Sequence, residues 1–242
     1  MIRFSIITVC LNEAQNIRRT CESVCAQSCR DFEWLVIDGG STDGTLDVLA
    51  EFAARIDHLV SEPDTGIYDA MNKGIRLARG DYLVFLNAGD LFADAGVLEA
   101  VLPCLGVDLV FGDLLCVSAA GEHSVRAFPD RLPRHFLLRH MLPHQASFFR
   151  RDLFAKYGEY DPSFRIAGDY ELFARLIEKH GISTRHLPKV LAVFRTDGIS
   201  SSRTQRALRR RENHRIRKRY FPWTVNGWDR IRLDIRFLLG GG

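Results

Sequence analysis

The sequence predicts an α/β fold, with a mostly parallel, Rossmann-like sheet flanked by helices and a helical extension at the C-terminus. Two observations carry this prediction. Short apolar runs rich in branched and aromatic residues alternate with amphipathic stretches through the first 90 residues, which is typical of strands joined by helical crossovers. One of these runs, Tyr82 to Leu86, contains no charged residue, so we expect a central strand buried on both faces of the sheet.

The expected elements follow a β-α-β-α-β-α-β order up to the central strand and are less regular after it. In the first half the predicted strands are 3–9, 32–37, 56–60 and 82–86, and the predicted helices are 12–27, 42–52 and 67–78. Asn12 is expected to cap the first helix, and Thr42 or Asp43 the second, because these side chains can accept a backbone N–H. Later in the chain the predicted strands are 108–116, 124–128, 145–149 and 186–194, and the predicted helices are 93–105, 132–140, 151–157, 169–180, 200–219 and 227–239.

Length and composition exclude several classes of protein. With 242 residues, 46% hydrophobic and 26% charged, the chain has the composition of a soluble globular protein and the length of one large domain with an appendage. It has no run of about 18 apolar residues, so we expect no transmembrane helix, and its start lacks the cleavage site of a signal peptide. The six cysteines have no paired metal-binding spacing and are expected to be small buried residues of a reduced, cytoplasmic protein.

Charge is distributed unevenly along the chain. Residues 195–242 contain 13 Lys or Arg against 4 Asp or Glu, a net charge of +9, whereas the whole chain carries +3 and the preceding part therefore −6. The aromatic residues that follow the basic stretch are Tyr220, Phe221, Trp223 and Trp228. A basic helix followed by such aromatics favours peripheral binding to an anionic membrane surface. The alternative is a helix packed on the domain with a solvated basic side. Nucleic acid is not expected as a partner, because the aromatic residues do not alternate with the charges.

Polar residues follow the first two predicted strands. Thr8, Asn12 and Glu13 lie at the end of the first strand, and Asp38 ends the second, just before the pair 39–40 of glycines. Parallel strands end at one edge of a sheet, and ligands bind in the crevice outside that edge. Asp38 suits the N–H of a base or a ribose hydroxyl, and the glycines let the backbone approach a ligand closely. The alternative is a pair of ordinary turns with helix caps.

Two further segments bring polar residues to the same edge. Asp64, Asn72 and Lys73 follow the third strand, and Lys73 is a candidate partner of a diphosphate, with a solvated helix lysine as the alternative. The turn after the central strand carries Asn87 and Asp90. A carboxylate at this place can hold a divalent cation against phosphate oxygens. The alternative is a simple turn, since Asn, Gly and Asp are common turn formers.

The order and spacing of these segments, together with residues 81–90, resemble the inverting family 2 glycosyltransferases with the GT-A fold, including bacterial surface-polysaccharide enzymes of the colanic-acid type. The resemblance covers about residues 3–200. It implies a nucleotide-binding half at 1–90, an acceptor-binding half at 91–200 and a C-terminal extension at 201–242. It also implies that a nucleotide-sugar lies across the strand ends. The side chains expected to contact it are those of Thr8, Asn12, Glu13, Asp38, Asp64, Asn72, Lys73 and Asn87.

The sequence departs from the family at the end of the central strand. The family usually has D-x-D there, whereas this chain has Asn87-Ala88-Gly89 followed by Asp90. A strict register places Gly89 where the metal-binding carboxylate often falls. We therefore expect either that Asp90 binds Mg²⁺ or Mn²⁺ from the next position or that metal binding is weak. Asn87 would still hydrogen-bond the ribose.

Residues 165–172 resemble the E-D motif of the family, whose Asp is the general base. Gly168 stands in place of the Glu, and Asp169 matches the base. A carboxylate within hydrogen-bond reach can take the proton of a sugar hydroxyl as the new bond forms. Asp169 is alternatively a helix N-cap, or serves both roles. His144 is a candidate contact of the acceptor, the diphosphate or a metal, with a structural role as the alternative. Residues 198–200 resemble a loop that closes over the donor.

The resemblance implies an enzyme that moves a single hexosyl or N-acetylhexosaminyl group, with a UDP-sugar as the expected donor. The expected acceptor is a hydroxyl of a sugar or lipid-linked oligosaccharide in polysaccharide or glycolipid biosynthesis. Q-x-x-R-W and membrane spans are missing from the sequence, which disfavours processive polymerisation. A non-catalytic nucleotide-sugar-binding protein is one alternative, suggested by Asn87 and Gly168. A Rossmann-type oxidoreductase is another, disfavoured because no G-x-G-x-x-G follows the first strand.

Overall fold

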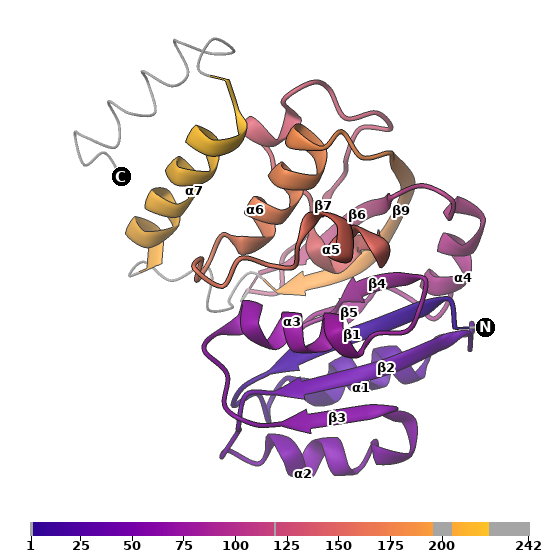
Figure 1. The fold of residues 1–242 in the computed structure, drawn as a ribbon. Coiled ribbons are helices and arrows are strands. Elements are labelled where there is room, and N and C mark those ends of the chain that lie inside the picture. The colour runs from indigo at the N-terminus through magenta and orange to yellow at the C-terminus, as the bar shows by residue number, and fades with distance from the viewer. Residues whose placement is uncertain (1, 119, 196–204, 223–242) are drawn as a thin grey trace.

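The computed structural model describes residues 2–118, 120–195 and 205–222. Within these residues, helices surround one nine-stranded sheet (Figure 1). The strands are β1 Phe4–Cys10, β2 Phe32–Asp38, β3 His58–Ser61, β4 Tyr82–Phe85, β5 Leu91–Phe92, β6 Leu109–Val117, β7 His123–Arg126, β8 Ser147–Arg150 and β9 Thr184–Arg195. The α-helices are α1 Ile17–Cys25, α2 Thr45–Ala50, α3 Ile67–Leu77, α4 Val97–Val101, α5 Asp152–Tyr157, α6 Gly168–Phe173 and α7 Arg206–Tyr220. A π-helical segment, Ala174–Lys179, continues α6.

The strand order in the sheet is β3-β2-β1-β4-β8-β6-β9-β5, with β7 paired to β6. The first four strands of this order are parallel, as the alternation of strands and helices predicts. The second half is mixed: β8 runs antiparallel to β4 and β6, β6 and β9 are parallel, and β5 and β7 are antiparallel to their partners. The predicted α/β fold is therefore confirmed, and the parallel part of the sheet lies within residues 1–90, for which nucleotide binding stays a prediction.

The parallel strands are buried on both faces because helices cover both sides of the sheet (Figure 1). Along β1, Ile7 and Val9 belong to one hydrophobic cluster, with α3 and α6. Phe4 and Ile6 belong to the other, with α1 and α4. The first cluster also includes residues beyond position 90 and Ile216 of α7, so the two proposed halves and α7 share one core.

Several predicted boundaries are wrong. The helix expected from residue 12 begins only at Ile17. Asn12 has a left-handed backbone (φ 55°), which a helix cannot include, and its side chain accepts the Thr42 backbone N–H instead of capping α1. The N-cap of α2 is Gly44 rather than Thr42 or Asp43, although the Asp43 side chain accepts the backbone N–H of Thr45, the first residue of the helix, at 3.0 Å. The helix predicted at 132–140 is only a 3₁₀ turn, Phe136–Leu138, and the short strand β5 has no counterpart in the prediction.

The basic helix α7 packs on the domain through Glu212, Ile216 and Tyr220, which recur every four residues and are buried. Figure 1 shows α7 lying alongside α6. The predicted helix 227–239, the loop 198–200, Trp223 and Trp228 lie outside the described residues. No helix in the described part of the chain is long and apolar enough to cross a bilayer.

Candidate active site

The carboxyl ends of β1 and β2 carry two loops that are bonded to each other. The Asn12 side-chain oxygen accepts the Thr42 backbone N–H at 2.9 Å, and the Asn12 N–H donates to the Ser41 hydroxyl at 2.8 Å. The Glu13 N–H donates to the Thr45 hydroxyl at 2.8 Å. These bonds place the two predicted nucleotide-binding segments side by side, as expected for neighbouring parallel strands.

Asp38, at the end of β2, organises this pair of loops. Its carboxylate is fully buried and accepts the backbone N–H groups of Gly40 and Ser41 at 3.1 and 3.0 Å, and the hydroxyls of Ser41 and Ser61. Burial alone would raise the pKa of Asp38, but these hydrogen bonds outweigh it and lower the pKa below its ordinary value. Asp38 is therefore an ionised anchor of the loop, and nucleoside contact by Asp38 stays a prediction.

Asp64 and Lys73 lie beside this loop. A Cβ on Gly39 would come within 2.6 Å of the Asp64 carboxylate, so the approach of Asp64 depends on glycine at position 39. Burial raises the pKa of Asp64, although the nearby Lys73 opposes the shift. Lys73 donates to the Pro63 carbonyl at 3.0 Å and pairs with Glu62 at 2.9 Å, so it would have to exchange these partners to bind a diphosphate.

Two predicted donor contacts have structural roles in this geometry. Thr8 is fully buried within β1, where its hydroxyl accepts the indole N–H of Trp34 at 3.0 Å. Asn72 is 3% exposed, and its amide makes two bonds of 2.9 Å to the backbone of Tyr160. Since the polar atoms of both side chains are already paired in the core, neither joins the loops at the strand ends.

A chain of polar side chains begins at Asn87, at the end of β4, and leads to Asp169. Asn87 Nδ2 lies 3.2 Å from His144 Nε2, and His144 Nδ1 lies 3.3 Å from Asp169 Oδ2. The Tyr68 hydroxyl donates to the Ile166 carbonyl at 2.7 Å and lies 3.4 Å from Asp169 Oδ1. The structure thus joins three predicted site residues, Asn87, His144 and Asp169, which come from three separate segments.

The hydrogen-bond directions between Asn87, His144 and Asp169 fit a neutral His144 imidazole. Nδ1–H of His144 donates to Asp169, and Nε2 accepts an N–H from Asn87. Burial lowers the pKa of His144, but the hydrogen bond and charge of Asp169, together with the charge of Asp90, raise it above its ordinary value. His144 therefore keeps its proton to a higher pH than an ordinary imidazole while it is in contact with the proposed base.

Asp90 lies in the turn after β4 and is 7% exposed. Its carboxylate accepts the Gln145 side-chain N–H at 3.4 Å. Burial raises its pKa to about 6, against the charge of His144, and the charge of Glu13 adds to the increase. Thr20 of α1 fixes the turn, because its hydroxyl donates to the Asp90 carbonyl at 2.9 Å and accepts the N–H of the preceding residue. Sequence reasoning did not identify Thr20, which is one buried polar residue in an amphipathic helix.

The residues near Asp90 fit a divalent cation that takes few ligands from the protein and the rest from water and a bound phosphate group. No three His, Cys, Asp or Glu side chains form a metal-binding group within the described residues. Asn87 Oδ1, however, is buried and has no hydrogen-bond partner there, and buried acceptors are rarely left unpaired. Mg²⁺ in such sites takes one or two carboxylates and completes its shell with water and substrate phosphates. One carboxylate and one unpaired amide oxygen satisfy the protein's share of that shell.

Asp169 is the second residue of α6, so the alternative that it is the N-cap is wrong; Ala167 occupies that position. Gly168, the departure from the E-D motif, has a physical cause. A Cβ at this position would lie 2.7 Å from the ring of Tyr68. Tyr68 thus occupies the space that any larger side chain at position 168 would need. Sequence reasoning did not identify Tyr68, whose contact with Asp169 spans 101 positions.

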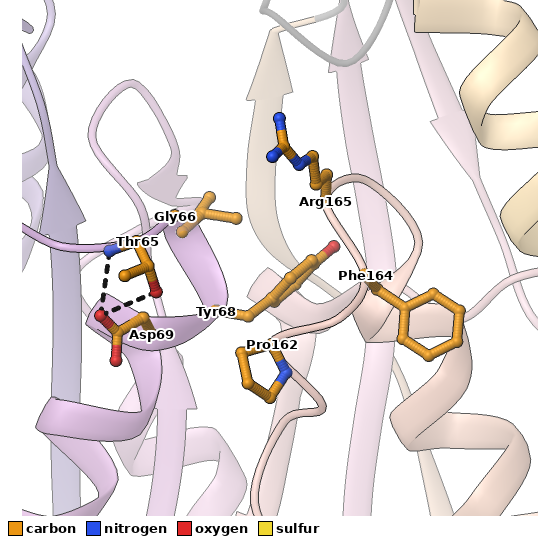
Figure 2. Close-up of a pocket in the computed structure, with 8 residues that line it drawn as sticks. Thr65, Gly66, Tyr68, Asp69, Pro162, Phe164 and Arg165 are labelled. Carbon is orange, nitrogen blue, oxygen red and sulfur yellow. Dashed lines mark hydrogen bonds between the residues drawn. The ribbon is translucent and has the colours of Figure 1, made fainter.

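A cavity of about 210 Å³ lies between the start of α3 and the segment 162–165. Its lining residues are Thr65, Gly66, Ile67, Tyr68, Asp69, Pro162, Phe164 and Arg165. Figure 2 shows the Tyr68 ring between the two walls and the Arg165 side chain extending beyond it. Arg165 makes no ion pair or side-chain hydrogen bond within the described residues, so its guanidinium is available to a ligand.

Known proteins share both sequence and fold with this chain. The family model described as Glycosyl transferase family 2 matches residues 5–158. The PGL/p-HBAD biosynthesis glycosyltransferase of Mycobacterium bovis is 37% identical over 202 residues, which cover 81% of this chain and 77% of the relative.

Two solved structures show the same architecture. Staphylococcus aureus TarS in complex with UDP-GlcNAc superposes with a TM-score of 0.67 at 15% identity, covering 98% of this chain and 71% of TarS. The mannosyltransferase PcManGT of Pyrobaculum calidifontis, in complex with GDP-Man and Mn²⁺, superposes with a TM-score of 0.66 at 23% identity, covering 90% of this chain and 63% of PcManGT. These likenesses confirm the GT-A fold that the resemblance implied. Because the family model spans more than half of the chain, and the mycobacterial relative most of it, this chain belongs to glycosyl transferase family 2.

Proposed function

We propose that this glycosyltransferase moves a single hexosyl or N-acetylhexosaminyl group from a UDP-sugar to an acceptor hydroxyl, with inversion at the anomeric carbon. The observation that carries this proposal is the contact between Asp169 and His144 next to the buried Asp90 turn. This contact supports the proposal because nucleotides bind at the strand ends in open α/β sheets, where Asn87 and Asp90 follow β4. The relative is described as a PGL/p-HBAD biosynthesis glycosyltransferase and TarS is in complex with UDP-GlcNAc, which supports sugar transfer from a UDP-sugar.

In the proposed reaction, Asp169 takes the proton of the acceptor hydroxyl. The hydroxyl oxygen then bonds to the anomeric carbon as the bond from that carbon to the diphosphate breaks, and the proton stays on the Asp169 carboxyl. His144 Nδ1–H and the Tyr170 N–H hold the carboxylate in place and leave it lone pairs for the acceptor. Attack from the side opposite the leaving group gives inversion.

Asp90 and the unpaired oxygen of Asn87 would hold Mg²⁺ or Mn²⁺. When bound, the cation supplies positive charge that stabilises the leaving nucleoside diphosphate. PcManGT, which shares the fold, is in complex with Mn²⁺, in line with this role. The Asn12–Glu13 and Asp38 loops would hold the nucleoside, and Asp64 and Lys73 would border the diphosphate. For the acceptor we propose the cavity beside Tyr68, because it opens next to the carboxylate that must reach the hydroxyl.

We also propose peripheral binding of this enzyme to the cytoplasmic face of an anionic membrane, which would bring a lipid-linked acceptor to the site. The solvent-facing side of α7 carries exposed basic residues, among them Arg206, Arg210, Arg211 and Lys218. Each Lys or Arg near an anionic surface contributes about 1 kcal/mol to binding.

The test is a panel of nucleotide-sugars, scored for binding and for slow hydrolysis, with and without Mn²⁺, and then for transfer to lipid-linked and soluble sugar acceptors. A preference for one UDP-sugar and a product of inverted configuration would support the proposal. A protein that binds a donor but releases no nucleoside diphosphate under any condition would be a nucleotide-sugar-binding protein instead.

A further inference from the structure

One carboxylate of α7 binds the backbone just ahead of Asp169. Glu212 Oε1 accepts the Arg165 N–H at 2.8 Å, and Oε2 accepts those of Ile166 and Ala167 at 3.0 and 2.8 Å. These donors are 45 to 47 positions away in the sequence. Glu212 is 6% exposed, so the charge-assisted bonds form away from bulk water, where they are stronger.

One of these bonds satisfies the N–H of Ala167, at the start of α6, and the other two hold the residues just ahead of the helix. The N-cap of α6, Ala167, has no side chain that can accept a hydrogen bond. The first N–H groups of a helix need acceptors, and an anion near them is favourable because of the helix dipole. Successive N–H groups that converge on one anion also fix the backbone dihedrals between them. Glu212 therefore sets the path of the chain that leads into the helical turn carrying Asp169.

Other residues of α7 hold the same segment from its two ends. Arg215 donates to the Ser163 hydroxyl at 2.6 Å, and its guanidinium lies 4.3 Å from the centre of the Phe164 ring. Beyond Asp169, the Tyr220 hydroxyl donates to the buried Glu171. The segment 161–171 forms one wall of the cavity and carries Asp169. It is thus supported by α7, which comes later in the sequence.

We propose that Glu212 is a positioning residue of the transfer reaction: it holds Asp169 and the 162–165 wall of the cavity in the geometry that transfer requires. This inference rests on the proposed function, since it presupposes Asp169 as the base. A displacement of about 1 Å at a reacting group can lower a rate about 100-fold. Loss of the carboxylate should therefore affect turnover far more than donor binding, which uses the opposite half of the sheet edge.

The test compares Glu212→Gln with Glu33→Gln. Glu33 is a matched control, because it is also a buried carboxylate that accepts backbone N–H groups, those of Arg79 and Gly80, at the amino end of β4, away from the site. We expect Glu212→Gln to lower kcat about 10- to 100-fold, to leave the Kd for UDP unchanged and to shift the pH of half-maximal kcat. Glu33→Gln should keep the kcat and pH profile of the wild type per folded molecule, and Glu212→Asp should recover part of the loss.

Amide hydrogen exchange gives a second readout that does not need turnover. Residues 165–167 should lose protection in Glu212→Gln and keep it in Glu33→Gln. Equal kcat and unchanged protection in Glu212→Gln would overturn the inference, and so would an equal loss of kcat in both variants. If Glu212→Gln does not fold, Glu212→Asp is measured in the same way. A wild-type protein without turnover on any donor would refute the proposed function, whereas the exchange measurement would still decide whether Glu212 holds this segment.

Discussion

His144 Nδ1 lies 3.3 Å from Asp169 Oδ2, so the carboxylate proposed to act as the base has a titratable partner. The side chains are 16% and 21% exposed, which leaves the pair accessible to an acceptor while screening it from bulk water. A second His–carboxylate pair, His135 and Glu178 at 3.0 Å, lies elsewhere in the fold. It supplies matched controls for the first two predictions.

Replacing Asp169 with Asn removes the proton acceptor but keeps the shape of the side chain. We expect transfer to fall about 100-fold or more while the Kd for the donor is unchanged. Steady-state kinetics and titration calorimetry measure the two quantities. Glu178→Gln, which breaks the control pair, should keep wild-type turnover. Near-normal transfer by a well-folded Asp169→Asn protein would rule Asp169 out as the base.

The raised pKa of His144 predicts the sign of the pH dependence. Below this pKa the imidazolium holds the Asp169 carboxylate in an ion pair for which the acceptor hydroxyl must compete, so kcat should rise as the pH increases through the pKa of His144. The same pair stabilises the fold fully below the ordinary His pKa of about 6.5, and this contribution is lost as the pH rises through the raised value. His144→Gln should flatten both profiles, whereas His135→Gln should leave the kcat profile as it is. A wild-type kcat that falls over this range would contradict the assignment.

Asp90→Asn should raise stability and weaken metal-dependent binding together. In metal-free protein, a carboxyl whose pKa is raised from 3.8 to about 6 destabilises the fold once it is ionised. Its contribution should therefore decline as the pH increases from about 4 to above 6, by up to about 3 kcal/mol. Denaturant unfolding in EDTA at about pH 4 and 8 should show a clearly larger gain in stability for Asp90→Asn over the wild type at the higher pH. Titration with UDP and Mn²⁺ should show weaker binding, and unchanged binding would remove Asp90 from the metal site.

Arg165→Ala separates acceptor binding from donor chemistry. If the acceptor occupies the cavity beside Tyr68, loss of the free guanidinium should raise the KM for the acceptor about tenfold. Hydrolysis of the donor by water needs no acceptor pocket and should be unchanged. Arg185, whose guanidinium donates to the Pro103 carbonyl, is a control at a distant surface, and Arg185→Ala should change neither rate. An effect of Arg165→Ala on hydrolysis alone would place the acceptor elsewhere.

Membrane binding is tested by charge reversal on the exposed side of α7. Arg210→Glu, Arg211→Glu and Lys218→Glu, combined in one protein, should abolish co-sedimentation with anionic vesicles at low salt. Turnover with a soluble acceptor should stay at the wild-type level, because these side chains face away from Glu212 and Ile216. Binding of wild-type protein should fall at high salt and be absent on neutral vesicles. Negligible binding of the wild type to anionic vesicles would refute the proposal.

The parallel half of the fold follows from local sequence signals. Apolar runs that end in polar turns predicted β1, β2 and β4 to within one or two residues, and strand-end geometry predicted that Asn12, Asp38 and Asp90 share one edge. The mixed half has no local signal of this kind. β8 lies between β4 and β6 because of pairing across 64 to 68 positions with β4 and 36 to 40 positions with β6, which periodicity cannot report.

The candidate site divides in the same way. The resemblance to the family indicated Asp169, the polar turn after the central strand indicated Asp90, and His144 was a candidate with a structural role as the alternative. Whether the other predicted residues reach the site depends on the direction of their side chains. Asn72, for example, faces Tyr160, which no spacing in the sequence indicates. The sequence did not indicate Tyr68 either. Its role depends on the absence of a side chain at Gly168, which is 100 residues away.

The two sides of α7 join a row of exposed basic residues to the segment that carries Asp169. A chain shortened ahead of Arg206 would lose its basic charge and also the carboxylate that braces residues 165–167. Such a truncation would look like a membrane-binding defect and a catalytic defect at once. Lipid or a partner protein that binds the outer side of α7 would therefore contact the same helix that holds residues 165–167 through Glu212.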